Sequence, residues 1–106
     1  MPFTGNEDHS ISLEDATEMT ENYRQATGLG LFLGAYFGKT AISDILSQDN
    51  CVGIRIYNAK SNAGKLNFVL VGVNANGDDM YDGELAEMGI ACPPFCPTSS
   101  PLNGTA

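Results

Sequence analysis

Apolar side chains recur at helical spacing near the start of the chain. Ser12 precedes this stripe and acidic residues fill the first turn, as is typical of a helix N-terminus. Gly28 is a natural stop, so the pattern predicts a first helix over residues 13–27. A shorter stripe of apolar residues predicts a second helix from about Thr40 to Gln48. Between the helices, the glycine-rich residues 28–38 predict a buried or partly buried connecting segment.

Two apolar segments in the middle of the chain predict β-strands. Residues 51–57 alternate, with Val52, Ile54 and Ile56 on one face, which is typical of a half-buried strand. Residues 66–73 are apolar on both faces, so both faces of that strand need a cover. The two predicted helices can cover one face of this strand. We therefore expect the C-terminal segment or another subunit to supply the second.

Weaker patterns follow these strands. Asn76–Gly77 predicts a hairpin turn, and Met80–Tyr81 predicts the start of a short third strand. Residues 84–88 predict one or two helical turns that stop at Gly89. Four of the five prolines lie in residues 92–106, which excludes a helix there and favours a docked, extended tail.

These elements predict one α+β domain over residues 1–106. Two N-terminal helices pack on a small antiparallel sheet, and an extended segment rich in proline and cysteine closes the chain. Residues 1–11 form an irregular arm, residues 12–91 form the body, and residues 92–106 form the tail. A chain of 106 residues leaves little length for a second domain.

Charge is unevenly distributed along the chain. The net charge is −8, yet all five basic residues lie between residues 24 and 65. Both ends are acidic, which favours a solvated surface or an approach of the acidic ends to the basic middle of the same or a neighbouring chain. So few basic residues exclude an extended nucleic-acid-binding surface. The first residues have neither the basic nor the apolar region of a signal peptide, and no apolar run spans a bilayer, so we expect a cytoplasmic protein without membrane insertion.

Three cysteines are the most informative candidates for chemistry. Cys92 and Cys96 flank Pro-Pro-Phe, and Cys51 lies far away in sequence. They are candidates for a disulfide, for unreactive thiols, or for a zinc site in which His9 supplies the fourth ligand. A metal- or redox-responsive protein is one alternative function.

Two other groups are weaker candidates. Asn74, Asn76 and Asp78 occupy alternate positions, as the first calcium ligands of an EF-hand loop do, but the later ligands are missing and a hairpin turn is favoured. Arg55 lies in an apolar strand, where it needs solvent, an acid or a ligand anion. A small ligand-binding protein or enzyme around Arg55 is therefore a second alternative.

Three segments carry a resemblance to known proteins: Gly53-Ile-Arg-Ile-Tyr57, Leu70-Val-Gly-Val73 and Cys92-Pro-Pro-Phe-Cys96. Through them the chain resembles small uncharacterised bacterial proteins of the Bacteroidetes type. The resemblance covers roughly residues 10–103 and implies no activity, cofactor or site residue. The only histidine lies in the arm, so no positioned catalytic pair is visible. We expect a non-enzymatic interaction or assembly module whose partner is itself or another protein, joined through the sheet or the C-terminal tail.

Overall fold

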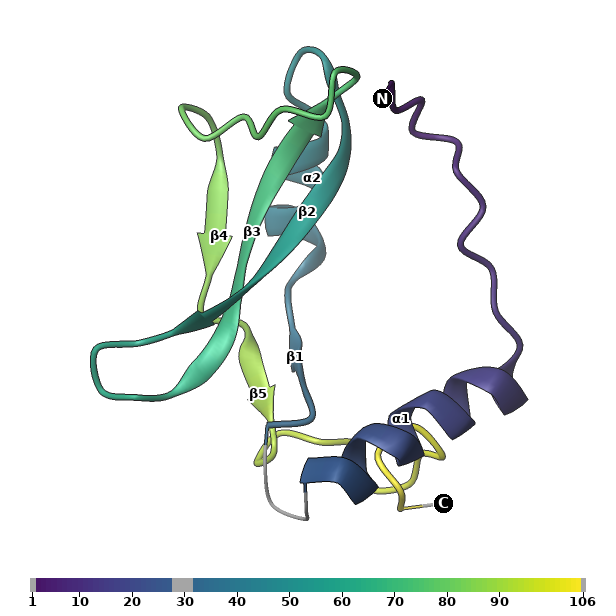
Figure 1. The fold of residues 1–106 in the computed structure, drawn as a ribbon. Coiled ribbons are helices and arrows are strands. Elements are labelled where there is room, and N and C mark those ends of the chain that lie inside the picture. Colours follow the sequence, from purple (N-terminus) through teal and green to yellow (C-terminus); the bar gives the residue numbers. More distant parts are fainter. Residues whose placement is uncertain (1, 28–31, 106) are drawn as a thin grey trace.

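The structure is a computed structural model, and it describes residues 2–27 and 32–105. Within these ranges both helices lie in the first half of the chain, and the strands form two small antiparallel sheets (Figure 1). The predicted α+β class is therefore confirmed. In chain order the elements are α1 (Leu13–Thr27), β1 (Gly34–Tyr36), α2 (Lys39–Leu46), β2 (Cys51–Lys60), β3 (Leu66–Asn74), β4 (Leu85–Glu87) and β5 (Ile90–Cys92).

The first helix has the predicted bounds. Ser12 Oγ accepts a hydrogen bond from the Asp15 amide at 3.0 Å, which satisfies one of the free N–H groups at the start of α1. α1 lies beside the C-terminal segment rather than over the larger sheet (Figure 1). Arg24 Nη1 donates to the Leu102 carbonyl at 2.8 Å, so the tail is docked on α1.

The second helix covers one face of the larger sheet. α2 lies against β2 and β3, and its Ile45 side chain is 1% exposed. Gly72 of β3 allows this close approach, because a Cβ atom at that position would lie 2.9 Å from Cys51 Sγ and 3.3 Å from Ile45 Cγ2. Of the two helices predicted to pack on the sheet, α2 does so, whereas α1 lies beside the C-terminal segment (Figure 1).

The two predicted central strands form a long hairpin. β2 and β3 pair antiparallel from Lys60 opposite Leu66 to Cys51 opposite Asn74, with an irregularity between Cys51 and Gly53. β4 pairs with the other side of β3, so the order is β2-β3-β4 and β2 is an edge strand. Both strands are confirmed, and β2 continues three residues beyond its predicted end.

Three local predictions need correction. Residues 85–87 form strand β4 rather than helical turns, because the sheet edge of β3 supplies their backbone partners. Met80–Tyr81 begins no strand; the chain instead makes an isolated bridge between Val73 and Asp79. The small sheet of β1 and β5 was not predicted; β1 lies in the glycine-rich segment 28–38, of which residues 28–31 lie outside the described residues.

The buried core is small. Among the described residues, the buried hydrophobic side chains are those of Ile45, Leu70, Val71 and Val73. The radius of gyration is 15.4 Å, whereas a compact domain of this length has about 13 Å. The N-terminal arm contributes to this extension, because it runs from α1 toward the far end of the sheet (Figure 1). Neither helix of the described chain has the length and apolar character of a membrane span.

Candidate functional site

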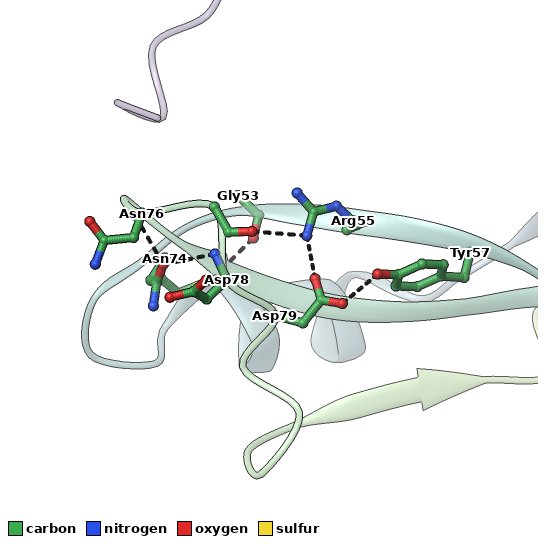
Figure 2. Close-up of polar contacts among 9 residues, drawn as sticks. Gly53, Arg55, Tyr57, Asn74, Asn76, Asp78 and Asp79 are labelled. Carbon is green, nitrogen blue, oxygen red and sulfur yellow. Dashed lines mark hydrogen bonds and ion pairs between the residues drawn. The ribbon is translucent and has the colours of Figure 1, made fainter. Parts of the chain in front are cut away.

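The candidate residue Arg55 belongs to a polar cluster on the face of the sheet opposite α2. Arg55 Nη1 donates to one carboxylate oxygen of Asp79, and the Tyr57 hydroxyl donates to the other (Figure 2). Arg55 Nη1 also donates to the Gly77 carbonyl at 3.2 Å. We call Arg55, Tyr57 and Asp79 the Asp79 cluster. The arginine is thus paired within its own chain, as one reading of the sequence expected.

The Asp79 cluster spans strand β3. Arg55 lies opposite Val71 on β2, whereas Asp79 lies opposite Val73 on the other side of β3. Directly opposite residues of antiparallel strands share a face, so the bonds between these side chains cross over β3. Val71 and Val73 beneath them are 3% and 4% exposed. The sequence predicted that the tail or another subunit covers the second face of β3. Part of that cover is instead supplied by the three side chains of the Asp79 cluster.

Each member of the cluster stabilises the ionisation state that the others need. The hydrogen bond from Tyr57, followed by that from Arg55, lowers the pKa of Asp79 against the opposing effect of burial. The hydrogen bond to Asp79 raises the pKa of Arg55 and also raises the pKa of Tyr57. The cluster therefore holds a carboxylate, a guanidinium and a neutral phenol at neutral pH.

The lowered pKa of Asp79 predicts a loss of stability in acid. The stabilising contribution is fully present above the carboxyl's ordinary value of 3.8 and is lost as pH falls through the lower folded value. Asp79→Asn is expected to be less stable than the wild type at pH 6, and urea unfolding should show this difference shrinking below pH 3.8. The same substitution at Asp82, an exposed position of the same loop, is the control and should change stability by less than about 0.5 kcal/mol. A difference for Asp79→Asn that is unchanged between pH 6 and pH 3 would contradict this role.

An open hollow of about 740 Å³ lies beside Arg55. Gln48 lines it together with the loop of residues 77–83, which carries Asp78, Asp79 and Asp82. Gln48 fixes this loop, since its Oε1 accepts the Glu84 amide at 2.8 Å. A ligand site at Arg55 would need such a hollow, but carboxylates outnumber the single guanidinium that lines it.

The cysteines are separated into a pair and a single thiol. Cys92 and Cys96 form a disulfide at the junction of β5 and the C-terminal segment, and Cys51 is free and half-buried. The disulfide occupies two of the three sulfur atoms that the zinc hypothesis needs, and His9 lies exposed in the arm. In the described part of the chain, no group of three histidine, cysteine or acidic side chains could hold a metal ion. The structure therefore does not assemble Cys51, Cys92, Cys96 and His9 into one site.

The calcium candidates form a hydrogen-bonded turn. Asn74 Oδ1 accepts the amides of Asn76 at 3.0 Å and Asp78 at 3.1 Å, and the Gly77 amide donates to the Asn74 carbonyl. Gly77 has a φ of 86°, which explains the glycine at this position. Because its oxygen binds the backbone, Asn74 acts here as a turn residue, in agreement with the favoured hairpin reading.

The outer edge of β2 is the other candidate site. No strand in the described ranges pairs with that side of β2. The N-terminal arm approaches only its first part, where a Cβ atom on Gly5 would lie 2.8 Å from the Val52 carbonyl oxygen. A hollow of about 580 Å³ separates the arm from the strand, with Gly5, Glu7 and His9 on one side and Val52, Ile54 and Ile56 on the other.

Sequence reasoning singled out Arg55 but neither of its partners. Asp79 follows a turn and Tyr57 ends an alternating segment, so only the β2-β3 register brings them together. The open edge was also missed, because a strand's position in a sheet has no local signal. No family model, curated protein or solved structure matches this chain.

Proposed function

We propose that this protein is a non-enzymatic assembly module that associates with a second copy of itself through its larger sheet. The observation that carries the proposal is the accessible surface of the single chain, which is 7709 Å². Folded monomers of 11.2 kDa expose about 5,700 Å². The chain therefore exposes about 2,000 Å² more than a compact monomer of its size, and stable homodimers bury surface on this scale.

The apolar part of this surface supports association through the sheet. Ile56 on the edge strand β2 is 60% exposed, and its neighbour Tyr57 is 45% exposed. An unpaired edge strand offers free N–H and C=O groups to another chain. The tail lies beside α1, so it leaves this edge open. A second copy paired along β2 would supply the missing backbone partners and an apolar neighbour for Ile56.

Amide hydrogen exchange at increasing protein concentration tests the proposal. Edge amides of β2 exchange rapidly in a monomer and slowly when they bond to another strand. We expect protection within residues 53–59 to rise with concentration, while that of residues 98–105 stays constant. Protection that rises in the tail instead would move the interface there. Protection independent of concentration in both segments would contradict self-association.

A further inference from the structure

We propose that two copies pair their β2 strands antiparallel about a twofold axis at Ile56, and that each N-terminal arm closes over the partner's strand. This inference rests on the proposed function and specifies its geometry. Ile56 of one copy then lies beside Ile56 of the partner subunit. The pairing joins two three-stranded sheets into one sheet of six strands.

The twofold axis restricts the possible registers. A twofold axis perpendicular to the sheet places the same face of both copies on the same side of the joined sheet. Two residues that lie opposite each other must therefore belong to the same face of β2. Residue 56 of β2 shares its face with residues 54 and 58, whereas 55 shares its face with 57. The axis must therefore pass through a residue of β2 and not between two residues. The choice of that residue fixes which residues of the two strands lie opposite each other.

Side-chain chemistry favours Ile56 over its two neighbours in β2. An axis at Arg55 would place two guanidinium groups opposite each other, which is unfavourable. An axis at Tyr57 would leave the exposed Ile56 opposite the partner's Asn58. An axis at Ile56 pairs two exposed isoleucines and places Tyr57 opposite the partner's Arg55. Arginine and tyrosine side chains attract each other as neighbours on one face.

The same register explains the acidic arm. With the axis at Ile56, the partner's Lys60 lies near Val52, just beyond the regular part of β2 and beside the arm. The arm approaches β2 at Val52 and carries Glu7 and Asp8. The Glu7 carboxylate is held in place, since it accepts the amides of Thr4 at 2.9 Å and Gly5 at 3.0 Å. Opposite charges thus meet where the arm borders the partner's strand, and the hollow between arm and β2 is the space that this strand enters.

Site-directed cross-linking tests the register. In a Cys51→Ser background, Ile56→Cys brings two thiols together at the axis, where opposite Cβ atoms lie about 4.5–5.5 Å apart. Oxidation by copper phenanthroline in air removes two electrons and two protons and joins the two sulfurs. We expect the 11.2 kDa chain to shift to a covalent dimer of twice that mass on a non-reducing gel. Each of Ile54→Cys and Asn58→Cys alone should stay monomeric on the gel, whereas a mixture of the two should cross-link.

The outcomes separate this inference from the proposed function. A covalent dimer from Ile54→Cys or Asn58→Cys alone, with none from Ile56→Cys, would overturn the register and leave edge pairing intact. No cross-link from any variant, in samples whose mass in solution is that of a dimer, would overturn β2 pairing but not self-association. If the chain without these substitutions is monomeric in solution, both the register and self-association would be overturned.

Discussion

Ile45→Ala is expected to lower the free energy of unfolding by about 2–5 kcal/mol, the usual cost of truncating a fully buried aliphatic side chain. Ile45 is the most deeply buried large side chain among the described residues. It packs against Gly72 of β3, which has no side chain that could move into the cavity. Because the core contains few other buried side chains, this loss is a large fraction of the stability of a small domain. Urea unfolding followed by circular dichroism measures it.

The neighbouring residue provides the control for this prediction. Leu46 belongs to the same helix but is 46% exposed, so Leu46→Ala removes a comparable side chain from a partly solvated position. We expect its cost to be less than half that of Ile45→Ala. Equal costs at the two positions would mean that α2 does not bury Ile45 against the sheet.

Ile56→Lys is expected to weaken self-association about 100-fold while leaving the fold of the chain intact. In the single chain Ile56 is 60% exposed, and lysine is common on natural edge strands. At the twofold axis, however, the substitution removes two apolar side chains and opposes two ammonium groups. Burial of an isoleucine contributes about 1.5–3 kcal/mol, so the pair accounts for ~3 kcal/mol or two powers of ten in the dissociation constant. Sedimentation equilibrium measures the constant, and circular dichroism monitors the fold.

Phe95→Lys is the matched control for the interface. Phe95 is 72% exposed in the C-terminal segment, so the same change of charge and size is made away from the sheet edge. We expect the dissociation constant of this variant to equal that of the wild type. Dissociation caused by Phe95→Lys, with none caused by Ile56→Lys, would assign the interface to the tail.

The elements that were predicted correctly are those with a strong local pattern. The stripe that starts at Leu13 and the alternation around Ile54 define α1 and β2 because periodicity acts over neighbouring residues. Residues 84–88 were misassigned for the opposite reason. Their pattern is too short to choose between helix and strand, and the edge of β3 decides in favour of β4.

The candidate site was predictable only in part. Arg55 attracted attention because a charged side chain in an apolar strand needs a partner. Its partner Asp79 lies 24 residues away, in a loop with several other acids, and the sequence does not distinguish among them. The disulfide pairing was likewise one of several alternatives for three cysteines. For Arg55 the decisive information is the pairing of β2 and of the loop after β3 with β3, whereas the disulfide is local and joins cysteines four residues apart.

The mass of the unmodified chain in solution tests the central claim most directly. A chain that exposes about 2,000 Å² more than a compact monomer is expected to cover that surface with a second copy. Sedimentation equilibrium at neutral pH should therefore give twice 11.2 kDa at high concentration and approach 11.2 kDa only on dilution. A mass of 11.2 kDa at every concentration up to the solubility limit would contradict the account.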